Sequence, residues 1–329
     1  MTIYFAGSEV DDFPDRINAV MSTIAAGFVR TAYATRGGVV IAGGFDGTAG
    51  ASFTASSTFF MTFRASFQTN IGTNPIVSLR SNGVHKLRLR GAGGGSNAAL
   101  ILEKHDGTTA TTLATSTLTV TTATPYKCDL AVEYGNPGRV RVWVDQALYI
   151  DYSGDTTTGG TTSLNSFRLY APGTSSSYTS VFSEVIVCTQ DSRTLSLVTL
   201  APNAAGTANA WTGAYTDVDD ITPSDTDVIS SSTANQVANF NLTGMPAGSS
   251  NLTVTAVKVC ALAARGATGP SKLALGVRTN SADSFPTAVT LDTGFSSQTA
   301  TYYETNPVTS LAWTTGEIDA LQIALKSEA

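Results

Sequence analysis

The chain has 329 residues, and at about 150 residues per domain this length predicts two domains. A hydrophobic content of 42% and a mean hydropathy of +0.07 exclude a wholly disordered chain, because that much apolar material is enough for buried cores. The formal net charge of -6 argues against binding to nucleic acid or to anionic membranes, since both require basic patches.

Hydroxyl residues dominate the polar part of the sequence, with 50 Thr and 33 Ser against 19 basic and 25 acidic residues. A surface of hydroxyls repels itself weakly, so it suits a protein that packs against many neighbours. The cysteines Cys128, Cys188 and Cys260 each lie in an apolar run and predict buried thiols made in a reducing compartment. The acidic N-terminus does not fit a signal peptide, and no apolar stretch approaches a membrane span, so we expect no membrane insertion.

Apolar and polar residues alternate along most of the first half, which predicts β-strands. These strands lie at residues 58–67, 85–90, 98–103, 108–122, 127–134, 140–144, 147–150, 166–170 and 181–188. The first of them carries an aromatic stripe, and 85–90 carries basic residues on one face. Residues 16–28 favour a strand over a helix because of Gly27 and the β-branched residues around it. Antiparallel strands with Gly, Pro and Asn turns, without βα alternation, predict a sandwich or jelly roll.

The pattern changes near residue 193, so we expect one domain at 1–193 and a second, smaller β-sandwich at 194–329. In the second domain we predict strands at 194–200, 252–262 and 273–277, and a loop of small residues at 202–210. Thr314 and Glu317 have capping-box spacing, which predicts a short helical turn before 320–325.

Residues 138–145, which read GRVRVWVD, followed by an apolar run at 147–150, resemble the strand and turn "G-x-V-x-V-x-V-D-G" of concanavalin A-like and laminin-G-like jelly rolls. Gln146 stands where that pattern has its turn glycine, and residues 182–187 resemble the closing strand of the same fold. The resemblance implies an all-β chain with a concanavalin A-like jelly roll first.

Three further segments are similar to tailed-bacteriophage virion proteins: residues 3–9, 198–202 with the following 211–213, and 313–314 with the following 318–323. This resemblance implies a non-enzymatic structural protein of the virion, tail- or fibre-associated or a capsid decoration. Its expected partners are other virion proteins and copies of itself, and its expected location is the virion, assembled in the bacterial cytoplasm.

Catalytic patterns are sparse in the sequence. Glycosidases on this fold need two carboxylates across a cleft, and no E-x-D-x-x-E or E-x-D-x-E spacing occurs. Asp129 and Glu133 share one side of a strand with Lys127, which indicates a solvated face with cross-strand pairs. With only His85 and His105, a multi-histidine zinc or catalytic cluster cannot form, although one Ser/His pair remains possible. We therefore expect no catalytic residues and no metal.

The acidic loop at 217–227 is the one candidate for a cation, because calcium prefers carboxylate oxygens. Its acids are Asp217, Asp219, Asp220, Asp225 and Asp227. The loop lacks the glycine and terminal glutamate of an EF-hand, so capping or a solvated acidic turn is the alternative to calcium, and no other cofactor is expected.

Four aromatic residues near predicted loops are the candidate binding site: Trp211, Tyr215, Tyr302 and Tyr303. An aromatic face can stack on the C–H groups of a sugar, and so these rings suit a glycan; the alternative is that they fill the core or a subunit contact. A carbohydrate-binding adhesin is therefore the alternative to the virion structural protein, and a glycan hydrolase comes third.

Overall fold

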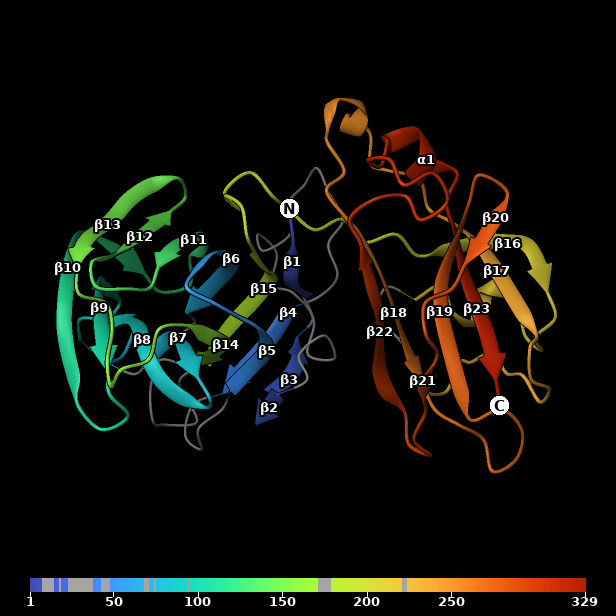
Figure 1. Ribbon diagram of the computed structural model, residues 1–329, viewed down its shortest axis with the longest axis horizontal. Coiled ribbons are helices and arrows are strands. Elements are labelled where there is room, and N and C mark those ends of the chain that lie inside the picture. Colours follow the sequence, from blue (N-terminus) through green and yellow to red (C-terminus); the bar gives the residue numbers. More distant parts are fainter. Residues whose placement is uncertain are drawn as a thin grey trace. The chain divides into compact units, whose positions relative to one another are not determined.

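The computed structural model describes residues 1–7, 15–17, 19–22, 38–42, 48–67, 71–73, 75–93, 95–170, 179–220 and 224–329. The contacts within the chain divide it into two compact units, with the division between Leu197 and Val198. We call the part that ends at Leu197 unit 1 and Val198–Ala329 unit 2, and each is described by itself (Figure 1).

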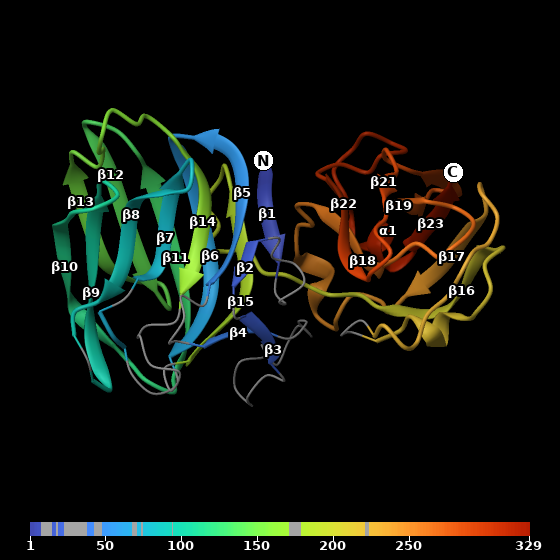
Figure 2. The ribbon, with the colours of Figure 1, turned by 90° about the horizontal axis from the view of Figure 1, so that it is seen from below.

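Unit 1 consists of antiparallel strands in two sheets, the arrangement of a jelly-roll sandwich. Its strands are β1 (Ile3–Gly7), β2 (Asp15–Ile17), β3 (Ala19–Ser22), β4 (Gly38–Ala42), β5 (Thr48–Ser56), β6 (Thr58–Phe67), β7 (Pro75–Ser81), β8 (Val84–Gly91), β9 (Asn97–His105), β10 (Ala110–Thr121), β11 (Pro125–Glu133), β12 (Gly138–Val144), β13 (Ala147–Gly154), β14 (Leu164–Tyr170) and β15 (Thr179–Cys188). Within the described ranges, the eight-stranded sheet has the order β13-β12-β11-β6-β15-β4-β3, with β1 beside β15. The seven-stranded sheet has the order β10-β9-β8-β7-β14-β5-β2, and Figure 2 shows β10, β9, β8, β7 and β14 side by side.

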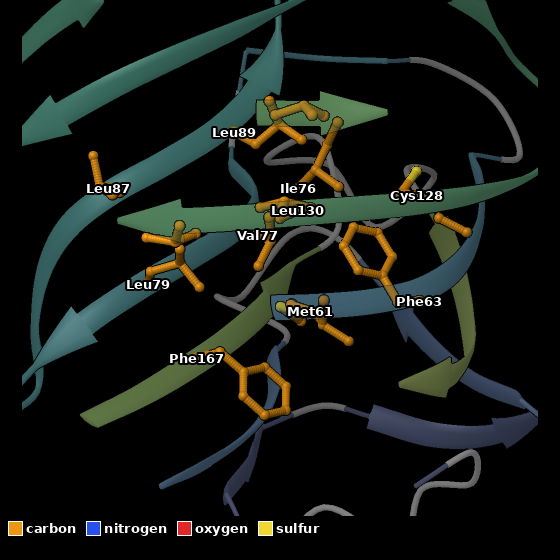
Figure 3. Packing of buried hydrophobic residues seen from close by; sticks show 14 of the residues in the cluster. Met61, Phe63, Ile76, Val77, Leu79, Leu87, Leu89, Cys128, Leu130 and Phe167 are labelled. Carbon is orange, nitrogen blue, oxygen red and sulfur yellow. The ribbon is translucent and has the colours of Figure 1, made fainter. Parts of the chain in front are cut away.

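The core of unit 1 lies between the two sheets. Met61, Phe63 and Leu130 of the eight-stranded sheet pack with Val77 and Phe167 of the seven-stranded sheet in one buried cluster (Figure 3). This cluster is the aromatic stripe predicted for 58–67 together with the apolar faces of the other strands. The predicted strands of unit 1 are thus confirmed, including strand structure at 15–17 and 19–22, while residues 23–28 lie outside the described residues.

Two tight hairpins in unit 1 depend on left-handed backbone. Asn82 and Gly83 have φ of 50° and 81° between β7 and β8, a combination that Asn-Gly adopts readily. Asp145 and Gln146 have φ of 47° and 71° between β12 and β13, so the turn forms although Gln146 stands in the place of the glycine.

Unit 2 is a smaller β-sandwich with one short helix. Its elements are β16 (Pro202–Asn209), β17 (Val237–Leu242), β18 (Val257–Ala263), β19 (Lys272–Thr279), β20 (Ala282–Ser284), β21 (Val289–Thr290), β22 (Ser296–Tyr303), α1 (Thr315–Asp319) and β23 (Gln322–Glu328), with 3-10 turns at Tyr215–Asp217 and Ser249–Asn251. In the described part, β16-β17-β23-β19-β20 form a sheet with β21 beside β19, and β18 pairs with β22. The hydroxyl of Thr314 accepts a hydrogen bond from the Glu317 amide, which confirms the predicted capping box of α1.

The strand predicted at 252–262 begins only at Val257, and two other predictions for unit 2 were wrong. Residues 195–200 form no strand, whereas 202–209, which we expected to be a loop, form the edge strand β16. An edge strand needs no large apolar residues, and Gly206 in β16 lies so close to Asn239 that a Cβ would overlap the neighbouring backbone. Lys127 donates hydrogen bonds to the carbonyls of Arg193 and Leu195 and holds residues 193–195 against unit 1, whereas Leu200 packs against the core of unit 2.

The cysteines form no disulfide; Cys128 and Cys188 are buried and Cys260 is partly exposed. Of the described elements, no helix is both long and apolar enough to cross a membrane.

Candidate functional site

The four aromatic residues predicted to bind a glycan lie at different depths in unit 2. Tyr303 is 7% exposed and belongs to the core, and its hydroxyl lies 3.4 Å from the Ser284 carbonyl. Trp211 and Tyr215 are partly buried against the same core, and the Trp211 indole donates to the Gln236 carbonyl at 3.1 Å. Tyr302, the neighbour of Tyr303 on β22, is also partly buried. The structure therefore places Tyr303 in the core, which was the alternative to glycan binding.

The acidic loop is built around Asp217. Its carboxylate accepts a hydrogen bond from the Ala214 amide at 2.8 Å, which is a capping role. Burial and the charges of Asp217, Asp220 and Asp219 raise the pKa of Asp227. Among the described residues, no three His, Cys, Asp or Glu side chains lie close enough together to hold a metal ion.

A different cluster of polar side chains covers the outer face of the seven-stranded sheet. Val77, Leu79, Leu87, Leu89, Leu102 and Phe167 point into the core, so the residues that alternate with them point outward. We call this outward cluster the basic face; its described members are Ser78, Arg80, His85, Lys86, Arg88, Arg90, Glu103, His105, Arg168 and Tyr170. It contains five cations and a single carboxylate in a protein whose net charge is -6.

Register places these residues next to one another. Ser78 on β7 pairs with Arg88 on β8 and with Arg168 on β14, and Arg88 pairs with Glu103 on β9. Arg168 also lies opposite Gly50 on β5, where an added Cβ would lie 2.9 Å from Arg168 Cγ. Gly50 therefore leaves room for the arginine side chain on the sheet surface.

Ser78 lies between His85 and Tyr170. Its Oγ is 2.7 Å from His85 Nδ1, and it lies close enough to the Tyr170 hydroxyl to act against the rise in the pKa of that phenol. The His85 ring lies 6.0 Å from the Tyr170 ring and 5.5 Å from the His105 ring, measured between centroids. A bulge where Leu79 and Arg80 face β8 turns His85 onto this face, beside Arg80.

The electrostatics of the basic face favour neutral rings and bound anions. Burial, followed by the charges of Arg80, His105, Arg88 and Arg168, lowers the pKa of His85 to about 4. Burial and Arg88 likewise lower the pKa of His105. Burial raises the pKa of Tyr170, against the opposing effect of nearby arginines. At neutral pH both imidazoles are therefore neutral and the phenol keeps its proton.

His105 has a fixed tautomer. Its Nδ1 accepts a hydrogen bond from the Gly107 amide at 2.9 Å, so the proton of the neutral ring lies on Nε2. The backbone carbonyl of His105 accepts from the Thr158 hydroxyl, and Lys86 Nζ lies 3.5 Å from the Thr158 carbonyl. Residues of the loop after β13 thus hold one end of the basic face.

Glu103 is held between two arginines and is 3% exposed. Arg88 Nη2 donates to Oε2 at 2.7 Å and Arg90 Nη2 lies 2.6 Å from Oε1. Burial alone would raise the pKa of Glu103, but the hydrogen bonds and charges of Arg90 and Arg88 outweigh it and lower that pKa. In the described part of the chain, Arg88 Nε has no hydrogen-bond partner.

This geometry excludes one kind of chemistry and permits another. Ser78 and His85 form the Ser/His pair that the sequence allowed, but Ser78 is 0% exposed and so cannot attack a substrate carbonyl. The arginines can bind carboxylates, the rings can contact a sugar, and His85 and Tyr170 can exchange protons.

On the outer face of the eight-stranded sheet, the prediction that Asp129 is solvated was wrong. Asp129 is 1% exposed, and neither carboxylate oxygen has a hydrogen-bond partner in the described structure. Lys127 Nζ lies 3.9 Å from Asp129 Oδ1, and Arg193 lies over the Trp143 ring beside it at 4.4 Å. Glu133, four residues after Asp129 on β11, is exposed as expected.

Sequence reasoning noticed part of the basic face and missed the rest. The alternation at 85–90 predicted one basic strand face, which is confirmed. Ser78 joins it through the β7–β8 hairpin. Arg168 and Tyr170 join it only through the pairing of β14 with β7, and nothing in their local pattern signals this.

No protein-family model matches the chain, and the search of curated proteins finds no match either. Solved structures with a similar course of the chain include an endo-beta-1,4-glucuronan lyase from Trichoderma reesei, at 14% identity and a TM-score of 0.42, covering 57% of this chain and 96% of that one. They also include the carbohydrate-binding module CBM66 from Bacillus subtilis, at 14% identity and 0.33, covering 53% and 97%. A third is the alginate lyase Aly36B, at 9% and 0.38, covering 58% and 99%. None of these three is named as a virion protein, and the assignment of the fold rests on the strand order of unit 1 itself.

Proposed function

We propose that unit 1 binds an acidic glycan, a polysaccharide whose sugars carry carboxylates, on the basic face. The observation that carries this proposal is the gathering of Arg80, Arg88 and Arg168 around the His85–Ser78–Tyr170 cluster on one sheet surface. This keeps the expectation of carbohydrate binding but moves it from the aromatic residues of unit 2 to unit 1.

The positive field of the basic face supports an anionic ligand. Three arginines each lower the pKa of His85, which means that their charges act at the same point of the surface. A planar guanidinium pairs with a planar carboxylate through two parallel hydrogen bonds, so arginine suits carboxylates well.

The uncharged groups support a sugar as the carrier of those carboxylates. The partly exposed His85 and Tyr170 rings give an apolar contact surface with polar edges, and His105 is buried behind His85. Nucleic acid is the other common polyanion, so the test includes a DNA duplex.

The test is a titration of the full chain with a polyuronate, a neutral glucan of similar length and a DNA duplex, at low and at high salt. We expect binding to the polyuronate that weakens with salt, because surface charge pairs are screened. We expect Arg88→Gln and Arg168→Gln each to weaken this binding about tenfold, which corresponds to roughly 1.4 kcal/mol for a charge-assisted contact.

Arg139→Gln is the matched control, because Arg139 is paired with Asp151 at 2.7 Å on the opposite sheet. It should bind as the wild type does. Absence of polyuronate binding would overturn the proposal, as would equal binding to the neutral glucan or tighter binding to DNA.

The predicted role in a virion remains a prediction alongside this proposal. A tail- or fibre-associated protein with such a face would contact a glycan on the cell surface, so the two roles are compatible. Immunolabelling of intact particles tests the virion role independently of any glycan.

A further inference from the structure

Residues 252–256 of unit 2 have the sequence of a β-strand but belong to none of the described strands. They read Leu-Thr-Val-Thr-Ala, so apolar residues alternate with threonine, and they continue directly into β18. The backbone at Leu252 is extended, with φ of -84° and ψ of 147°. β18 nevertheless begins only at Val257, which pairs with Tyr303, the last residue of β22. The segment therefore continues the line of β18 past the end of the strand that pairs with it.

The backbone of this segment has unused hydrogen-bonding groups. Among the described residues, no backbone hydrogen bond joins 253–256 to another part of the chain. Within the same described structure, β18 has a single neighbour, β22, in a two-stranded sheet, so its second edge is open as well (Figure 1). Open edges of this kind accept a strand from another molecule.

The side chains keep the segment in a conformation that a partner strand can join. Val254 is half-buried against the core of unit 2, whereas Thr253 is exposed and Leu252 is 41% exposed. Because Val254 anchors the backbone, pairing with a new strand costs little further conformational entropy. Pairing also gives the exposed Leu252 side chain an apolar neighbour.

The order of the residues favours a second copy of this chain as the partner. When the segment pairs antiparallel with itself about a two-fold axis at Val254, Thr253 lies opposite Thr255 of the second copy, and Leu252 lies opposite Ala256 of the second copy. Pairs of threonines stabilise antiparallel strands. A two-fold axis is also the commonest symmetry of protein oligomers, and it requires a surface that complements itself.

Charge favours the same partner. No residue from 228 to 257 is charged, although the chain has a net charge of -6. Two copies therefore repel each other overall, and an uncharged segment is where they can approach with the least repulsion. In the antiparallel register about Val254 the nearest charged residue, Lys258, lies opposite Ser250 of the second copy, so no like charges meet.

We propose that residues 252–256 pair antiparallel with the same residues of a second copy, with the two-fold axis at Val254, and form the contact of a dimer. This contact is independent of glycan binding, because it lies in unit 2 and the basic face lies in unit 1. It gives the expected association of the chain with itself a location. It also accounts for strand sequence without strand structure, since the partners of this backbone belong to the second copy.

Sedimentation equilibrium of the full chain over a range of concentrations tests the dimer, and hydrogen exchange of the amides within 253–256 tests its location. We expect a monomer–dimer equilibrium in which these amides are protected at high concentration and lose protection on dilution. The double variant Thr253→Lys/Thr255→Lys places lysine opposite lysine twice. We expect it to raise the dissociation constant of the dimer about tenfold or more.

The double variant Thr253→Lys/Thr255→Glu is the matched control, because it places lysine opposite glutamate at both positions. It should dimerise at least as tightly as the wild type. Thr115→Lys/Thr117→Lys adds two lysines at exposed positions of β10 in unit 1 and should leave the dissociation constant unchanged. Circular dichroism of each variant distinguishes loss of the dimer from loss of the fold.

A wild-type chain that remains monomeric at every concentration would overturn the dimer. A dimer whose amides within 253–256 exchange as fast as those of the monomer would place the contact elsewhere and overturn the proposal as well. Dimerisation of the lysine–lysine variant at wild-type strength would do the same. Loss of the dimer in a folded lysine–glutamate variant would overturn the antiparallel register about Val254.

Discussion

The outer faces of the unit 1 sandwich carry buried carboxylates, and two of them, one on each face, lie in opposite environments. Glu103 on the seven-stranded sheet is 3% exposed and is bonded by Arg88 and Arg90. Asp129 on the eight-stranded sheet is 1% exposed and accepts no hydrogen bond in the described structure. The pKa of Glu103 is lowered by its arginines, although burial opposes them, whereas burial raises the pKa of Asp129 against the pull of Lys127.

The difference teaches that burial does not by itself determine what a carboxylate contributes. Glu103 holds two cations in place on a face that we propose to be functional, and its negative charge is the favoured state. Asp129 lies beneath the segment after β15 that Lys127 and Arg193 attach to the sheet, and its negative charge is the disfavoured state. The following predictions test this contrast.

Replacement of Glu103 should have the largest effect. Glu103→Gln leaves Arg88 and Arg90 adjacent without their shared counter-charge, and we expect unfolding free energy to fall by about 3 kcal/mol. Urea denaturation measures this. Glu133→Gln makes the same change at an exposed position on β11 and should cost less than about 1 kcal/mol. Equal losses in the two variants would contradict the contrast.

Replacement of Asp129 should have a smaller effect of opposite sign. Asp129→Asn removes a buried charge and leaves the side-chain volume nearly unchanged. The new amide can donate to the hydroxyl of Thr62, which lies opposite position 129 on the neighbouring strand β6 and has no hydrogen bond in the described structure. We expect a gain of about 1–2 kcal/mol at neutral pH in the same urea assay. Asp151→Asn on the exposed edge should change stability little. A loss of stability in Asp129→Asn would show that the ionised carboxylate is not the costly state.

The two carboxylates should also give the stability opposite dependences on pH. Since the folded pKa of Glu103 is lowered, its contribution is complete above the usual glutamate pKa and is lost as the pH falls through the folded pKa. Since the folded pKa of Asp129 is raised, the fold loses stability as the pH rises from the usual aspartate pKa through the folded pKa. Each slope is at most about 1.4 kcal/mol per pH unit.

Urea titrations of wild type, Glu103→Gln and Asp129→Asn across the acidic range measure the contribution of each carboxylate. That contribution is the difference in stability between the wild type and the corresponding variant. The advantage of wild type over Glu103→Gln should shrink on acidification. The advantage of Asp129→Asn over wild type should shrink as well. Parallel curves for wild type and either variant would contradict the corresponding shift.

Periodicity predicted most of unit 1 because nearly every strand there has a full apolar face against one core. It failed at β16, whose residues alternate between partly buried and exposed without any large apolar side chain. It failed again at β17, where Asn239 is fully buried because its carbonyl oxygen accepts a hydrogen bond from the Ala208 amide. Local patterns report burial against a core. β16 is held largely by backbone pairing, and the buried polar Asn239 interrupts the apolar pattern of β17, whose Ala238 and Phe240 lie in the core.

The candidate site was less accessible to sequence reasoning. The basic alternation at 85–90 is local, but the Ser78–His85 contact depends on a bulge, and Tyr170 reaches it from a strand that pairs with β7 across the sheet. Asp129 was expected in solvent because the strand pattern cannot show that residues 191–195 lie over it. Net charge was equally uninformative, since a chain of charge -6 collects five cations on one face.

The smallest effect concerns the segment that covers Asp129. Arg193 lies 4.4 Å over the Trp143 ring and its side chain is 41% exposed, so Arg193→Ala should lower stability by only about 0.5–1 kcal/mol. The segment should stay in place, because Lys127 still donates to the backbone carbonyls of residues 193 and 195. Trp143 fluorescence and urea denaturation measure the two quantities, and Arg141→Ala, whose guanidinium lies 5.3 Å from the same ring, is the matched variant. A loss above about 2 kcal/mol from Arg193→Ala would mean that the guanidinium, rather than Lys127, fixes the segment and keeps Asp129 out of solvent.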